Sequence, residues 1–240
     1  MKVDGTDQRL IVAGGEMVPA WTPKGELTYS TQSDPGYNLA TLDGSIRNLS
    51  DIGYGHSWSP DMSRLAYLIS ERIMISSSTS HSDEAFVTVG WSPPSWSPDG
   101  TRITYSKTSD DGVYVYDFRD SSEIQLTKFG GRPKWSPVTK KHHSAYNYIV
   151  FSSRTWGTSD VFTVDVDTGE PTRITDWPVD EEYPSWSPDG AKIVFMGNDH
   201  AHRGGNEIFV MDADGSNPIN LTQHPASDTF PAWSPVPVED

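Results

Sequence analysis

The chain contains no cysteine among its 240 residues. Disulfides, catalysis by a thiolate and zinc sites with cysteine ligands are therefore excluded. Long apolar runs are absent as well, because no stretch approaches the roughly 18 residues of a membrane-spanning helix. The opening residues Met1–Asp4 do not resemble a secretory signal peptide. The fold must therefore be held together without covalent cross-links.

Positive charge is scarce, with 18 Lys and Arg against 33 Asp and Glu and a net charge of −15 at neutral pH. Such a surface repels phosphate backbones and anionic lipid, so nucleic acid and membrane surfaces are unfavourable partners. The excess of acid serves solubility, or it recruits a cationic protein segment or calcium. The partner that we expect is a protein or peptide, with a cationic segment as one candidate.

A tripeptide recurs along the whole chain. A tryptophan followed by Ser-Pro, or once by Thr-Pro, returns at intervals of 37 to 51 residues. A period near 40 residues indicates one supersecondary unit that is copied along the chain. We expect the tryptophans to fill wedge-shaped gaps between units rather than to bind a ligand. They are Trp21, Trp58, Trp96, Trp135, Trp186 and Trp233.

Each unit contains four short strands, which we call A to D in chain order. In the clearest copy, Tyr183–Ser187 predicts strand A, Pro188–Gly190 a turn, and Lys192–Met196 strand B with alternating and β-branched residues. Glu207–Met211 and Ile219–Thr222 predict strands C and D. Four strands per 40-odd residues, joined by hairpins, are typical of a β-propeller blade.

The repeats predict a single all-β domain over residues 1–240, a propeller of four-stranded blades. Residues 4–11 match the end of a unit and predict a strand D, and 233–235 match the start of one and predict a strand A. We therefore expect six blade positions with an incomplete last blade, and a five-bladed ring with terminal extensions is the alternative. The expected repeats are approximately 21–57, 58–95, 96–134, 135–185 and 186–232, with 1–20 and 233–240 as a partial terminal unit.

Residues 183–190, which read Tyr-Pro-Ser-Trp-Ser-Pro-Asp-Gly, resemble the TolB-type (WD-like) β-propeller repeat of bacteria, as do residues 94–100 and 207–217. Similar proteins include periplasmic TolB, which bridges proteins of the cell envelope, and the non-catalytic propellers of prolyl oligopeptidase-like and tricorn-like peptidases. The resemblance implies a non-enzymatic scaffold for protein–protein interaction, periplasmic or secreted, with the cytoplasm as the alternative. The Gly-x-Ser-x-Gly elbow of the peptidases' hydrolase domain does not occur in the chain.

The connections on one face of the expected ring vary in length and residue type. The B–C and D–A connections share this face, and the more uniform A–B and C–D turns share the other, so we expect binding on the first. The most unusual B–C connection is 198–206, where His200 and His202 are candidate ligands of a divalent metal. Asp199 and Arg203 of the same segment pair locally or contribute to binding. No other cofactor is expected.

An acidic run with an aromatic neighbour lies in the D–A connection before the fifth strand A. We expect it to form part of a rim around the channel mouth that anchors a peptide. Arg132 and His56 occupy similar places in other repeats. The candidate partner-binding residues are thus Asp180, Glu181, Glu182, Tyr183, Asp199, His200, His202, Arg203, Arg132 and His56, and no catalytic residue is predicted.

Two further interpretations of the function stay open. The first is a propeller lyase or hydrolase that acts on a polysaccharide or peptide at the channel mouth. The second is the non-catalytic propeller module of a larger enzyme. An incomplete last blade would also leave strand edges that invite self-association.

Overall fold

The computed structural model describes residues 19–31, 34–40, 46–50, 54–77, 83–107, 111–138, 145–198, 205–223 and 226–235. These residues form twenty β-strands and no helix. The strands assemble into five antiparallel sheets of four strands each, and each sheet consists of strands that are consecutive in the chain. The prediction of an all-β propeller with four-stranded blades is confirmed, and the described residues form five blades rather than six.

The five sheets follow one another along the sequence. The first blade contains β1 (Ala20–Trp21), β2 (Leu27–Thr31), β3 (Asp34–Ala40) and β4 (Ile46–Ser50), and the second contains β5 (Tyr54–Trp58), β6 (Arg64–Ile69), β7 (Arg72–Ser77) and β8 (Asp83–Val89). The third blade contains β9 (Ser95–Trp96), β10 (Arg102–Tyr105), β11 (Tyr114–Asp117) and β12 (Ser122–Gln125), and the fourth contains β13 (Gly131–Trp135), β14 (Tyr148–Trp156), β15 (Thr158–Asp165) and β16 (Pro171–Arg173). The fifth blade contains β17 (Glu181–Trp186), β18 (Lys192–Asn198), β19 (Asn206–Asp212) and β20 (Ile219–Asn220).

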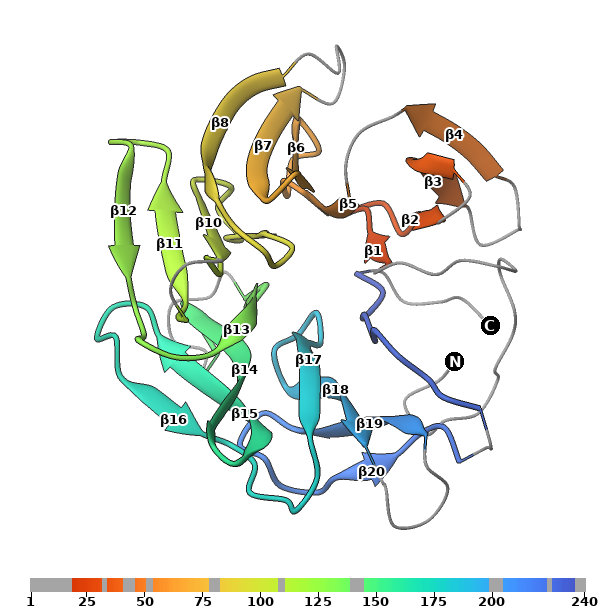
Figure 1. The fold of residues 1–240 in the computed structure, drawn as a ribbon, viewed down its shortest axis with the longest axis vertical. Coiled ribbons are helices and arrows are strands. Elements are labelled where there is room, and N and C mark those ends of the chain that lie inside the picture. Colours follow the sequence, from red (N-terminus) through yellow and green to blue (C-terminus); the bar gives the residue numbers. More distant parts are fainter. Residues whose placement is uncertain are drawn as a thin grey trace.

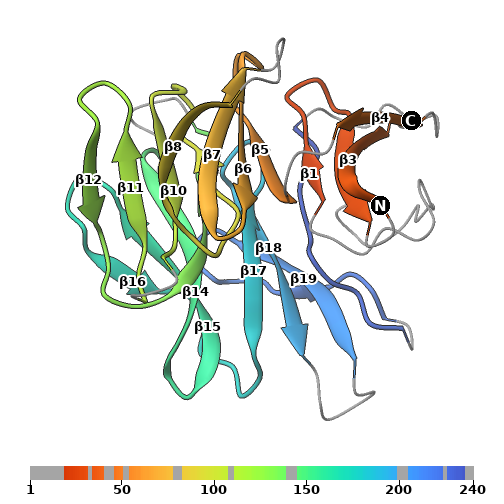
Figure 2. The same cartoon turned by 45° about the horizontal axis from the view of Figure 1, so that its top comes forward.

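The sheets stand around a common axis, as the two views of the ribbon show (Figures 1 and 2). The first strands β1, β5, β13 and β17 lie nearest the axis, whereas β12 and β16 lie at the outer edge (Figure 1). Neighbouring first strands also contact one another, as β9 does β13 and β13 does β17. The inward side of these strands therefore lines the central channel.

The turn from strand A to strand B is held by the same hydrogen bonds in three blades. In the third blade the Ser97 hydroxyl donates to the Asp99 carboxylate at 2.6 Å and accepts the backbone N–H of Arg102 at 3.0 Å. Ser59 with Asp61 and Ser187 with Asp189 repeat the first bond at 2.6 Å. The Ser-Pro-Asp part of the repeat is thus the device that closes this hairpin.

The hydrophobic core lies between neighbouring blades. Trp96 packs in one cluster with Leu68 and Ile73 of the preceding blade. Trp135 packs in the same way with Val113 and Val115. Because these two tryptophans are only 6% and 5% exposed, the interpretation that they seal the blades is confirmed for them. Trp186, which is 6% exposed, packs with residues of the fourth blade in a third cluster.

The prediction of a strand A at Trp233 is wrong, because residues 226–235 form no strand. The segment nevertheless reaches the first blade, since the Trp21 indole N–H donates to the carbonyl of Ala232 at 3.3 Å. Trp96 makes the corresponding bond to the carbonyl of Ser57 at 2.9 Å. Among the described residues the segment pairs with no strand of either neighbouring blade, so no ladder of backbone hydrogen bonds holds it extended. The predicted strand D at 4–11 lies outside the described residues.

Candidate functional site

The site grows from the innermost strand of the fourth blade, β13. Along this strand Gly131, Pro133 and Trp135 are buried, and Arg132 and Lys134 are partly exposed. Side chains alternate between the two sides of a strand, and Trp135 points into the core between blades. Lys134, next to Trp135, therefore points to the opposite side of the strand from the tryptophan.

A β-bulge recurs three residues before the tryptophan of several blades. The register shifts between Gly131 and Lys134 in β13 and between Glu182 and Ser185 in β17. The residue inside the bulge has a positive φ, 55° at both Arg132 and Tyr183. Phe230, at the same place before Trp233, has a φ of 56°. Bulges bend the strand and redirect a side chain, and here they bring the side chains of successive blades together.

Four side chains from successive repeats form a row that we call the mouth stack: Trp91, Arg132, Tyr183 and Phe230. The Arg132 guanidinium lies 5.2 Å from the centre of the Trp91 ring and 4.4 Å from that of Tyr183. Tyr183 meets Phe230 edge to face with ring centres 4.6 Å apart. Cation–π and edge-to-face contacts each stabilise by about 0.5–2 kcal/mol, so the stack holds Arg132 in place.

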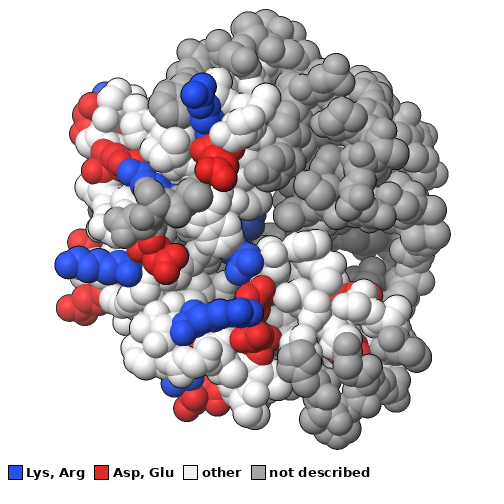
Figure 3. All heavy atoms as spheres, in the orientation of Figure 1, with Lys and Arg blue, Asp and Glu red and all other residues white. Residues whose placement is uncertain are grey.

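The acidic run faces two arginines. The Arg154 guanidinium lies 3.0 Å from the Asp180 carboxylate and 3.1 Å from that of Glu182, and Arg132 lies 3.5 Å from the same Glu182 oxygen. Asp180 also accepts the backbone N–H of Ser159 at 2.8 Å. Basic side chains lie beside acidic ones on the described part of the face drawn in Figure 3. The expected acidic rim is therefore locally neutralised.

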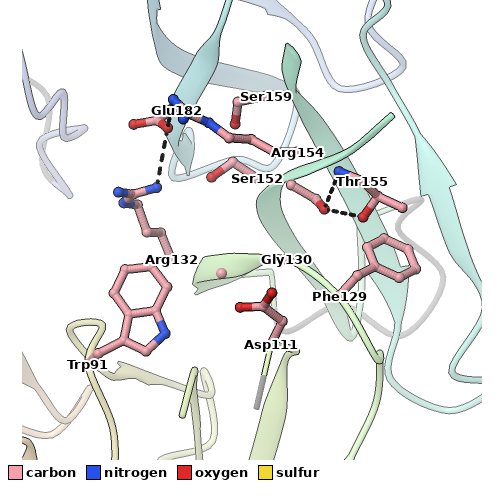
Figure 4. Close-up of a pocket in the computed structure, with 12 residues that line it drawn as sticks. Trp91, Asp111, Phe129, Gly130, Arg132, Ser152, Arg154, Thr155, Ser159 and Glu182 are labelled. Atoms are coloured by element: carbon pink, nitrogen blue, oxygen red, sulfur yellow. Dashed lines mark hydrogen bonds and ion pairs between the residues drawn. The ribbon is translucent and has the colours of Figure 1, made fainter. Parts of the chain in front are cut away.

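A cavity of about 310 Å³ opens between these groups. Figure 4 shows Arg132 and Glu182 on one side of it and Asp111 on another. The remaining walls come from the ends of strands and the B–C and D–A connections of the third and fourth blades, so the cavity lies on the face that the variable connections predict for binding. The residues that form these remaining walls are Trp91, Phe129, Gly130, Gly131, Ser152, Ser153, Arg154, Thr155 and Ser159.

Glu181 behaves differently from its acidic neighbours. It is fully buried, and its carboxylate accepts a hydrogen bond from the Thr175 hydroxyl. Burial, together with the negative charge of Asp160, raises its pKa to about 8. The carboxyl group is thus mostly protonated at neutral pH. Its predicted place on an exposed rim is wrong, because Glu181 begins β17 and points to the interior.

Lys134 occupies a position that holds a small residue in the other repeats. The residue just before the tryptophan is Ala20, Ser57, Ser95, Ser185 or Ala232 in the other repeats. Burial lowers the pKa of Lys134 to about 8, as expected when an ammonium group loses water without gaining an ion pair. Among the described residues no ion pair to its ammonium group is formed.

Comparison with known proteins identifies the fold. No family model matches the chain. An uncharacterized protein of Agrobacterium fabrum is 28% identical over 203 residues, which are 75% of this chain and 65% of that protein. The Tol-Pal system protein TolB of Francisella tularensis is 45% identical over 47 residues, 20% of this chain and 11% of TolB. The chain thus matches less than two thirds of the length of either relative.

Solved structures extend the likeness to most of the chain. A putative TolB from Agrobacterium tumefaciens superposes with a TM-score of 0.70 at 23% identity and covers 91% of this chain and 86% of its own. TolB from Acinetobacter baumannii gives 0.68 at 21% identity, covering 85% and 53%. The chain has the TolB-type β-propeller fold. An oligogalacturonate lyase in complex with manganese gives 0.60 at 14% identity, covering 87% and 66%.

In this TolB-type propeller the predicted site residues other than Glu181 fall into three groups. Asp180, Glu182, Tyr183 and Arg132 come together at the channel mouth. His56 is only 3% exposed within β5, so it offers little surface to a partner. The third group lies in the predicted B–C connection and outside the described residues. Its members are Asp199, His200, His202 and Arg203, which include the two candidate metal ligands.

The described residues contain neither a metal-binding cluster nor a membrane-spanning helix. Within them, no three His, Asp or Glu side chains gather closely enough to hold a metal ion. None of these residues belongs to a helix that is long and apolar enough to cross a membrane.

Several residues of the channel mouth were not among the predicted site residues. Phe230 carried a usable signal, because it precedes Pro231 just as Arg132 and Tyr183 precede their prolines. Arg154 carried none, since its partners are 26 and 28 residues further along the chain and meet it only across two blades. Trp91 and Lys134 were likewise missed, although Lys134 breaks a row of small residues.

Proposed function

We propose that this TolB-type propeller is a non-enzymatic scaffold that binds a protein partner at the channel mouth. The observation that supports it is the cavity of about 310 Å³, which is lined by side chains that differ between repeats. Aromatic residues and arginine, the types that dominate binding energy at protein interfaces, form the mouth stack beside it. A regular scaffold that varies at one pocket is suited to selective recognition.

The relatives' names supply the finer parts of the proposal. One is a component of a Tol-Pal system, which favours a periplasmic or secreted location and a partner in the cell envelope. The net charge of −15 favours a partner with net positive charge. Self-association through the terminal blade position is a further proposal, motivated by residues 226–235, which reach the first blade without forming a strand.

A second candidate is the propeller module of a larger enzyme, or a propeller lyase. An uncharacterized peptidase of Bacillus subtilis is 25% identical over 123 residues, which are 18% of its length. The match to so small a share of that relative fits a module. The lyase likeness supports the fold alone.

Affinity capture from solubilised envelope proteins tests the first proposal with two matched variants. Arg154 on the mouth and Arg119 on the opposite face are both 63% exposed and both form an ion pair with aspartate. Arg154→Glu should abolish capture of the partner and Arg119→Glu should leave it unchanged. If both variants lose the partner, or if the wild type captures none, the proposal that the scaffold binds its partner at the channel mouth is refuted. Turnover of oligogalacturonate or of peptides would favour the second candidate.

A further inference from the structure

The Arg132 guanidinium is held in position but poorly satisfied. Its two faces are covered by Trp91 and Tyr183. Its charge meets one carboxylate, Glu182, at 3.5 Å, and its side chain forms no hydrogen bond to another described residue. Guanidinium has five N–H donors in a rigid fork that matches a carboxylate. Arg132 is one of the residues that line the cavity (Figure 4).

Glu182 is shared between two cations and is a weak competitor for Arg132. The same oxygen lies 3.1 Å from Arg154, which is closer than its 3.5 Å to Arg132. The best ion-pair hydrogen bonds are about 2.7–2.9 Å long. Arg132 therefore retains donors for a second carboxylate that enters from the cavity.

Asp111 stands on another wall of the cavity and is exposed. Its charge disfavours a second anion, so the arrangement suits one carboxylate rather than a polyanion.

We propose that the cavity binds a single carboxylate of a peptide segment, with Arg132 as its fork-shaped anchor. This inference rests on the proposed function and names the chemistry that the partner presents. It is compatible with a partner of net positive charge, because the charge of the whole chain acts at long range and the arginine acts on one group in contact. The carboxylate belongs to an acidic side chain or to a chain terminus.

A peptide fits better than an acidic polysaccharide. Sugar rings bind by stacking on open aromatic faces, whereas the aromatic rings here are engaged: Trp91 and Tyr183 with Arg132, and Phe129 with Phe151, Trp156 and Phe162. A polyuronate also carries a charge on every ring, and the net charge of −15 repels it.

Calorimetric titration with four probes tests the inference. The probes are N-acetyl-tetraalanine with a free carboxyl terminus, its carboxyl-terminal amide, N-acetyl-Ala-Asp-Ala-Ala amide, and trigalacturonate. The proteins are the wild type, Arg132→Gln, Arg132→Lys, Glu182→Gln and the control Arg119→Gln. At least one of the two peptide carboxylates should bind the wild type at least tenfold more tightly than the uncharged amide. Which of them does so tells whether the carboxylate is a terminus or a side chain.

The variants separate recognition from folding. Arg132→Gln should weaken the carboxylate probe at least tenfold, Arg132→Lys should weaken it less, and Glu182→Gln should strengthen it severalfold. Arg119→Gln should change nothing. The inference would be overturned if the acid and the amide bound equally or if neither bound. It would also be overturned if Arg132→Gln bound the carboxylate probe as tightly as the wild type, or if trigalacturonate bound more tightly than the peptides in an Arg132-dependent way. If a protein is captured but no probe binds, the scaffold function is supported and the carboxylate site is refuted. If a probe binds but no protein is captured, the carboxylate site is supported and the scaffold function is refuted.

Discussion

The two faces of the ring are built from the same repeat but differ in regularity. On the face of the A–B turns, Ser59, Ser97 and Ser187 form one hydrogen bond to an aspartate with the same length of 2.6 Å. On the opposite face, equivalent positions hold Arg132 and Tyr183, which contact each other. The repeated contacts stabilise the blade, and the contacts that occur once make this propeller different from others of its fold.

The largest effect should come from breaking the repeated architecture. Trp96→Ala should lower the free energy of unfolding by about 3–5 kcal/mol, because it leaves a cavity between two blades and removes the indole hydrogen bond to Ser57. Chemical denaturation measures it. Phe230→Ala, at a half-buried place in the mouth stack, should cost clearly less. Equal losses would mean that the mouth is as structural as the core.

The turn face should show the next largest effect. Ser97→Ala removes a fully buried hydroxyl that donates to Asp99 and accepts from the Arg102 backbone. We expect a loss of about 2 kcal/mol with no change in partner binding, since a buried N–H is left without its acceptor. Thermal unfolding and affinity capture measure the two parts. Weakened capture would contradict the assignment of stability to the turn face and of partner binding to the mouth.

Glu181 should make the stability of the fold depend on pH. Its folded pKa of about 8 lies above the ordinary value of 4.5, so the folded state binds more protons than the unfolded state between these values. Stability should therefore fall as pH rises from about 4.5 to 8, with a slope of up to about 1 kcal/mol per pH unit. Glu181→Gln should remove this slope in denaturation at a series of pH values. An unchanged profile would show that Glu181 is ionised in the fold.

Lys134 should have the smallest effect on stability. Its folded pKa of about 8 lies below the ordinary value of 10.5, so folding at neutral pH costs free energy that is regained as pH rises from about 8 to 10. Lys134→Met should stabilise the fold by about 1 kcal/mol at pH 7 and by less at pH 10. Denaturation at both pH values measures it. A destabilised variant would reveal an ion pair of Lys134 in solution.

Much of the fold could be predicted from the sequence, because its signals are local. The alternation in Lys192–Met196 predicted β18, and the tripeptide repeat predicted the blade and its tryptophan. The site was less accessible. The bulge in β17 breaks the alternation that would have shown Glu181 pointing inward, and Arg154 finds its partners only when two blades stand side by side.

Capture of an envelope partner by the matched arginine variants tests the central claim most directly. Arg154 and Arg119 are equally exposed and lie on opposite faces, so their replacement by glutamate should change stability by about 0.5 kcal/mol or less in either case. The account predicts that Arg154→Glu loses the partner at unchanged stability and that Arg119→Glu keeps it. Loss of the partner in Arg119→Glu alone would contradict the account and place binding on the turn face.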